Sequence, residues 1–306
     1  MSRRPTFVSR PRLAVSITTV IACANAFCAD DDGSKWFLVK APTGQDSKKP
    51  AQVIFARDDE NSSTLTNVAA LWKRDLMPTN ATMATSLGAS VGFSKNTLSQ
   101  KRYELFTVGG NVQSVIALTD SKLDTVDLNA DYLLENDREH GARGWAGIVD
   151  ATLISASWLH LDPNLERGKK ENGLDGWLYP SLGLYHRRVS STNSPSDSPV
   201  GSHGGIYAGL RGTFRWFSLN KDAALINRLS VEAAYLHARE SSVSGDYNEA
   251  SYRYGEVSVN FLLYGEPSGK GWKPILGFTR SKGTNRVANE PQVNQSQLSF
   301  KLSYGV

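Results

Sequence analysis

The sequence lacks cysteine beyond its first 28 residues. The only two cysteines in the 306-residue chain are Cys23 and Cys28. The rest of the chain therefore has no disulfide framework and no cysteine metal site. Its five histidines are scattered, and their spacing matches none of the recognised metal-binding motifs. We expect neither a metal nor a cofactor.

The chain also lacks a long hydrophobic run and a strong excess of charge of one sign. No stretch approaches the ~20 consecutive apolar residues that a transmembrane helix requires. Lysine and arginine total 34 against 30 aspartates and glutamates, which gives a net charge of +4. This balance is mild and evenly spread, so it does not indicate a nucleic-acid partner.

The first 29 residues have the features of a secretory signal peptide. Four arginines lie in the first twelve residues, an apolar run from Leu13 to Ala22 follows, and small residues come after it. An organelle transit peptide is the alternative for such a segment. A second alternative is lipidation at Cys23, because Val20-Ile21-Ala22-Cys23 resembles a bacterial lipobox. We divide the rest into a polar segment, 30–50, and a folded unit, 51–306.

The C-terminal ten residues alternate strictly between apolar and polar side chains. Leu298, Phe300, Leu302 and Tyr304 are separated by serines and Lys301. Successive side chains of a β-strand point to opposite faces, so one face of this strand is apolar and the other is small or charged.

Similar alternation recurs along the chain between polar breaks, and it predicts about twelve strands. Most are close to the ~9–11 residues that a tilted strand needs to cross a bilayer. An extra strand at 36–39 is also conceivable. The predicted strands cover residues 51–57, 64–73, 84–94, 102–118, 123–135, 145–161, 177–188, 204–218, 228–239, 253–265, 272–281 and 297–306.

These features together resemble the Gram-negative outer-membrane β-barrels, including the porins. The leader, the cysteine-poor body and the amphipathic C-terminal strand carry the resemblance, although the chain ends in Tyr304-Gly305-Val306 where such barrels usually end in an aromatic residue. The resemblance implies a single closed antiparallel transmembrane β-barrel, apolar outside and polar inside. It also implies an outer-membrane location, contact with lipid and lipopolysaccharide, and handling by the barrel-insertion machinery. It leaves the oligomeric state open.

Aromatic residues near the strand ends suit such a barrel, because amphipathic rings favour the level of the lipid headgroups. β-Propensity alone is the simpler explanation of their frequency. The aromatic residues in question are Trp72, Tyr103, Tyr132, Trp145, Trp158, Trp177, Trp216, Tyr264 and Trp272.

The even strand count places both termini on one side and the longer connections on the other. We expect these longer connections to face outwards from the cell. They are 58–63, 95–101, 136–144, 189–203, 240–252 and 282–296.

The alternation also assigns ten charged side chains to the interior of the barrel. One hypothesis is a narrow channel, in which these charges select small anionic or dipolar hydrophilic solutes. The alternative is that the charges pair with one another and fill the interior. The predicted inner charges are Asp127, Asp131, Asp150, Arg187, Arg211, Arg215, Glu232, Glu256, Lys273 and Lys301.

Two further functions remain open at this stage. His186 and His237 are predicted on the apolar face near the outer rim, where a histidine could activate a serine for acyl hydrolysis of lipids. Neither histidine has the sequence spacing that this chemistry demands, and an interfacial histidine beside a loop is the simpler interpretation. A structural barrel whose outer loops contact a partner is the other possibility. Fold alone does not choose among these functions.

Overall fold

The computed structural model describes the main part of the chain and omits its N-terminal segment and several connections. The predicted signal peptide, residues 1–29, and the cysteines within it lie outside the described residues. The described residues are 34–39, 51–57, 62–76, 82–97, 102–118, 124–161, 172–194, 199–218, 225–264, 271–288 and 290–305.

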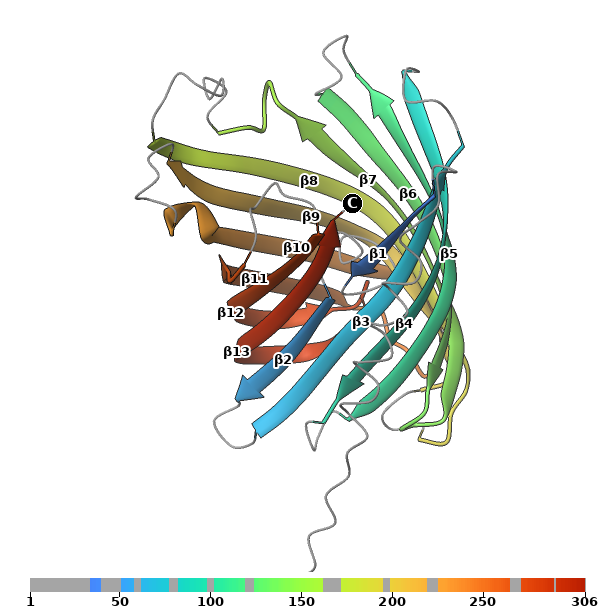
Figure 1. Ribbon diagram of the computed structural model, residues 1–306. Helices are drawn as coiled ribbons and strands as arrows, with labels where there is room; N and C mark the ends of the chain where they lie inside the picture. The colour runs from blue at the N-terminus through green and yellow to red at the C-terminus, as the bar shows by residue number, and fades with distance from the viewer. Residues whose placement is uncertain are drawn as a thin grey trace, which may run out of the picture.

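The described chain is all-β and consists almost entirely of antiparallel strands (Figure 1). A short 3₁₀-helix, Ile226–Arg228, precedes β10. No described helix is long and apolar enough to cross a membrane. The strands are β1 (Ser34–Val39), β2 (Ala51–Arg57), β3 (Ser62–Asp75), β4 (Met83–Asn96), β5 (Tyr103–Ala117), β6 (Asp124–Asp137), β7 (Ala142–Ser155), β8 (Asn172–Ser191), β9 (Gly201–Ser218), β10 (Leu229–Gly245), β11 (Ser251–Leu262), β12 (Gly271–Asn285) and β13 (Glu290–Gly305).

The thirteen strands exceed the twelve expected because of β1. β1 pairs with residues 69–74 of β3, whereas β2 pairs with residues 62–67 of the same strand. The two short strands therefore follow one another along a single edge of β3. β1 lies within the segment 30–50, at the position where the sequence left an extra strand open.

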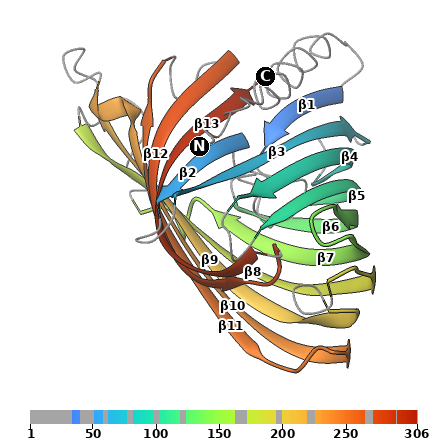
Figure 2. The same ribbon diagram turned by 90° about the horizontal axis from the view of Figure 1, so that it is seen from below.

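Consecutive strands pair with one another from β2 to β13. In addition, β13 pairs with β2 through residues 296–302. Every strand from β2 to β13 therefore pairs with a neighbour on both sides, and β3 pairs with β1 as well. The view from below shows the sheet curling around, so that β2 and β3 lie between β13 and β4 (Figure 2).

At one end of this sheet, the connections lead from an even-numbered strand to the odd-numbered strand that follows it. We call this end the mouth; it includes the connections β6–β7, β8–β9, β10–β11 and β12–β13. These are the connections that the sequence analysis expects to face outwards. Several strands extend further towards the mouth than predicted. β8 continues to Ser191, and β9 begins at Gly201.

Candidate functional site: the polar inner face and the mouth

The two faces of the sheet differ sharply in the kind of side chain that they bury. Large apolar side chains are exposed on one face: Leu182 is 63% exposed and Val149 is 55% exposed. On the opposite face polar side chains are buried, and Ser258 and Ser299 are each 1% exposed. This is the reverse of a water-soluble protein, in which apolar side chains fill the interior. We call the polar face the inner face and the apolar one the outer face.

The outer face includes the apolar set of the C-terminal strand. Leu298 and Phe300 are exposed, while Ser299 and Lys301, which alternate with them, are buried. The alternation of β13 therefore places its polar set on the inner face, as the sequence analysis expected.

The alternation of faces along each strand places all ten predicted inner charges on the inner face. Five of them are buried: Asp127, Asp131, Asp150, Arg187 and Lys301. The other five are only half-buried: Arg211, Arg215, Glu232, Glu256 and Lys273.

The three inner arginines do not form one group. Arg187 of β8 pairs in register with His203, at the mouth end of β9. Arg211 lies eight positions along β9 from His203, about 26 Å at the usual rise of a strand. Arg211 lies over the ring of Tyr179, with Cζ 4.8 Å from the ring centroid, and Arg215 is 3.6 Å from a carboxylate oxygen of Asp175. The arginines thus occupy two levels of the interior.

The inner carboxylates of β6 and β7 accept hydrogen bonds from amide side chains. Asn111 donates to Asp131 at 2.6 Å, and Asn129 donates to Asp150 at 3.1 Å. Gln113 donates to both oxygens of Asp127, at 2.8 and 2.9 Å. Sequence reasoning singled out the carboxylates and missed these amides.

A similar chain of contacts lines β10, β11 and β13. Lys301 donates to the side-chain oxygen of Asn260 at 2.7 Å, and the amide nitrogen of Asn260 donates to Glu232 at 3.2 Å. Hydrogen bonds to charged groups are stronger than those between neutral groups, so these contacts help to fix the register of the wall.

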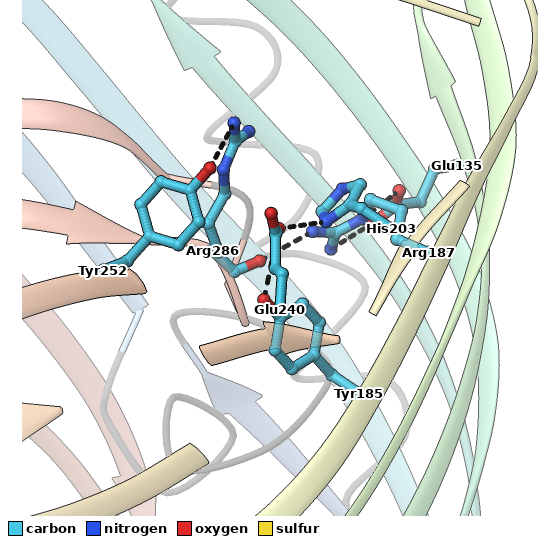
Figure 3. A network of polar contacts seen from close by, with 7 residues as sticks. All are labelled: Glu135, Tyr185, Arg187, His203, Glu240, Tyr252 and Arg286. Atoms are coloured by element: carbon cyan, nitrogen blue, oxygen red, sulfur yellow. Dashed lines mark hydrogen bonds and ion pairs between the residues drawn. The ribbon is translucent and has the colours of Figure 1, made fainter. Parts of the chain in front are cut away.

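A second polar network lies at the mouth. We call it the mouth cluster; it consists of Glu135, Tyr185, Arg187, His203, Glu240, Tyr252 and Arg286 (Figure 3). Arg187 donates through Nε and Nη2 to the two carboxylate oxygens of Glu135, at 2.9 and 3.0 Å. Its Nη1 donates to the backbone carbonyl of Arg286 at 3.0 Å. One buried guanidinium therefore joins β6, β8 and the turn between β12 and β13.

His203 and Glu240 form the buried centre of the mouth cluster. The two side chains are each 1% exposed, and Nδ1 of His203 is 2.8 Å from a carboxylate oxygen of Glu240. Tyr185 donates its hydroxyl to the same oxygen at 3.3 Å. The ring of Tyr247, in the β10–β11 connection, lies 4.6 Å from the His203 ring. Burial raises the pKa of Tyr247, so its phenol stays neutral at ordinary pH.

The turn between β12 and β13 folds inwards onto this cluster. Val287 is buried, and it belongs to an apolar group with Tyr185, Tyr207 and Ala238 of strands β8, β9 and β10. The register of β12 and β13 shifts between Gly283 and Asn285. Gly283 has φ of 110°, a conformation that glycine adopts readily, and such a bulge bends the strand. The inner face at the mouth is therefore partly covered by the turn 286–288.

A cavity of about 440 Å³ opens beside the mouth cluster. It is lined by residues of β5 to β8 and by the connections β8–β9, β10–β11 and β12–β13. Within the described residues, no group of three or more histidine, aspartate, glutamate and cysteine side chains is arranged to hold a metal ion.

His186 and His237 lie on the outer face near the mouth, as the sequence analysis expected. The ring of His186 is 5.2 Å from that of Trp145, and His237 pairs in register with Ala208 and Arg253. Within the described part of the chain, neither ring makes a hydrogen bond to a serine or a carboxylate. The structure therefore assembles no nucleophile and base around them.

Sequence reasoning missed most of the mouth cluster. His203 was assigned to a loop because a run rich in serine and proline precedes it. The alternation of His203, Tyr207 and Arg211 along β9 was the available signal that the strand reaches this far. Trp177 was expected at the lipid level, but it has the parity of the inner face, and its indole donates to Asp175 at 3.1 Å.

No protein-family model matches the chain, and no curated protein matches it. Three solved structures of outer-membrane barrel proteins are similar to it. The translocator domain of autotransporter NalP from Neisseria meningitidis is 9% identical, with 96% of each chain covered and a TM-score of 0.40. An outer-membrane channel from Pseudomonas putida F1 is 12% identical, with 90% of this chain and 96% of that chain covered and a TM-score of 0.44.

The KdgM porin is 8% identical, with 83% of this chain and 99% of that chain covered and a TM-score of 0.36. At such low identities and TM-scores, these similarities carry no argument about function.

Proposed function

We propose that this chain is a closed β-barrel of twelve strands, β2 to β13, in a bacterial outer membrane, and that it conducts small hydrophilic solutes. The observation that carries the proposal is the reversed distribution of side chains, with apolar groups exposed and polar groups buried. A face of this kind is stable against lipid tails, and an antiparallel barrel satisfies its backbone polar groups without water.

Solutes of this barrel are anionic or dipolar. The inner face carries charges of both signs, with carboxylates concentrated on β6 and β7 and arginines on β8 and β9. Charges of opposite sign on neighbouring walls create a transverse field that orients a dipolar solute. The inward-folded turn 286–288 narrows the mouth and sets the size of the solutes that pass.

Planar-bilayer conductance of the purified, folded chain tests the proposal. We expect discrete openings, and a reversal potential in a salt gradient that indicates a preference for anions. A folded barrel that inserts and shows no openings would contradict conduction.

The narrowing of the mouth is tested separately by Val287→Ser. A polar side chain weakens the apolar contacts of the turn, so we expect a larger single-channel conductance. Val200→Ser is the matched control, because Val200 is an exposed valine in the β8–β9 connection. Equal conductance of the Val287→Ser and Val200→Ser variants would show that the turn does not narrow the passage.

The acyl-hydrolase alternative makes a different prediction. Phospholipid turnover by the wild type that is lost in His186→Ala or His237→Ala would support it. We expect neither replacement to change turnover, because neither ring makes a hydrogen bond to a serine or a carboxylate among the described residues.

A further inference from the structure

We propose that the cavity at the mouth is a binding site for a small organic carboxylate with an apolar body. The inference rests on the proposed function in one respect, since it names the class of solute that the mouth receives. The cavity has a volume of about 440 Å³, which lies within the range of ~300–1,000 Å³ that is usual for sites that bind small molecules.

Three guanidinium groups and three carboxylates line the cavity, and most of the carboxylates are already engaged. Glu135 accepts two hydrogen bonds from Arg187. Asp137 accepts the backbone N–H groups of Glu104 and Glu139, at 3.1 and 3.0 Å, and lies 2.6 Å from the ring nitrogen of His140.

Two guanidinium groups of the lining, those of Arg143 and Arg286, differ from Arg187 in their partners. Neither Arg143 nor Arg286 makes an ion pair with a carboxylate among the described residues. Asp246, which is exposed, makes no ion pair among the described residues. The charged groups of the lining are therefore equal in number, and the preference for an anion depends on Arg286, which makes no ion pair with a carboxylate among the described residues.

Arg286 is held in a position that suits a carboxylate. Its Cζ lies 4.9 Å from the centroid of the Tyr252 ring, and its Nη2 donates weakly to the Tyr252 hydroxyl at 3.4 Å. Its Nε is buried and has no hydrogen-bond partner in the described part of the chain. The planar fork of a guanidinium binds the two oxygens of a carboxylate side by side, and stacking on an aromatic ring fixes its plane.

Apart from Asn248, the other side chains of the lining are apolar or aromatic. The side chains of Leu105, Val189 and Pro199 and the rings of Tyr247 and Tyr252 complete the wall. A ligand that places its charged group on Arg286 therefore has apolar and aromatic side chains of the lining available to its remaining atoms. This favours a carboxylate with a ring or a branched chain over a small, fully hydrated anion.

Benzoate is a suitable probe, with benzamide and benzylamine as neutral and cationic analogues of nearly the same shape. Isothermal titration of the full chain, folded in detergent micelles, measures binding without any need for conduction. We expect benzoate to bind more tightly than either analogue. Inorganic phosphate is an anion without an apolar body, so its affinity reports what the charge alone contributes. We expect phosphate to bind more weakly than benzoate.

The decisive variant is Arg286→Gln. The side chain of Arg286 holds Tyr252, whereas its backbone carbonyl accepts from Arg187, so the replacement leaves the contact with Arg187 in place. We expect the affinity for benzoate to fall ~10-fold or more, because a charge-assisted hydrogen bond is lost. Arg286→Lys retains the charge without the fork, and we expect an intermediate loss.

Arg253→Gln is the matched control, because Arg253 is an exposed arginine on β11 near the mouth, with the parity of the outer face. Its affinity for benzoate should equal that of the wild type. Unchanged affinity in Arg286→Gln, equal binding of benzamide or phosphate, or no binding of benzoate by the folded wild type would each overturn the proposal. Benzoate binding in a chain that shows no conductance would contradict the channel and leave the binding site standing.

Discussion

Replacing Leu182 by arginine tests whether the outer face contacts lipid. Leu182 lies near the middle of β8, and it is 63% exposed. An arginine on the lipid face of a barrel costs ~2–4 kcal/mol near the bilayer midplane. The same replacement on a surface that faces water changes stability by only about 0.5 kcal/mol. The two environments thus predict effects that differ several-fold.

The assay is equilibrium unfolding by guanidinium of the chain reconstituted in phosphatidylcholine vesicles, followed by tryptophan fluorescence in both directions. We expect Leu182→Arg to lower the free energy of unfolding by ~2–4 kcal/mol. Val200→Arg is the control, because Val200 is 41% exposed but lies in the connection before β9. We expect its effect to stay within about 0.5 kcal/mol.

The reasoning is refuted if Leu182→Arg and Val200→Arg change stability by the same small amount. That result would place the middle of β8 in water. The apolar outer face would then require a protein partner in place of lipid.

Two further predictions concern the inner face. The Cβ that Gly183→Ala adds would lie 2.5–2.7 Å from ring atoms of Tyr207, so we expect a loss of ~1–3 kcal/mol in the same unfolding assay. Gly255→Ala is the control, because the added Cβ has open space around it, and it should lose no stability. Equal stabilities of the Gly183→Ala and Gly255→Ala variants would mean that the ring of Tyr207 moves freely. Arg187→Met leaves Glu135 buried without its partner and should cost ~3–5 kcal/mol. The double variant with Glu135→Gln should lose less, and a larger, additive loss would contradict the pairing.

The faces of the strands were predictable because a period of two is a local property of the sequence. Val257 and Ser258, for example, differ in polarity, and the structure exposes the first and buries the second. The all-β, antiparallel architecture followed from the same pattern. Once the face of one residue in a strand is assigned, the alternation assigns a face to each charged side chain of that strand.

The mouth cluster was not predictable in the same way, because its contacts join distant parts of the chain. Arg187 and Arg286 are 99 positions apart, and their contact depends on an inward-folded turn that a register shift permits. The sequence also does not show whether the space beside a glycine of the inner face is empty or is filled by a side chain of another strand. At Gly183 it accommodates the ring of Tyr207, which lies on the neighbouring strand.

Quenching by lipids with brominated chains reports most directly which face of the sheet contacts the membrane. A fluorophore is attached to a single cysteine at position 256 or 257, two adjacent positions on opposite faces of β11, with Cys23 and Cys28 replaced by alanine. We predict strong quenching in the Val257→Cys protein and little in Glu256→Cys. Equal quenching at both positions, or stronger quenching at 256, would contradict an outer face in lipid and an enclosed polar face.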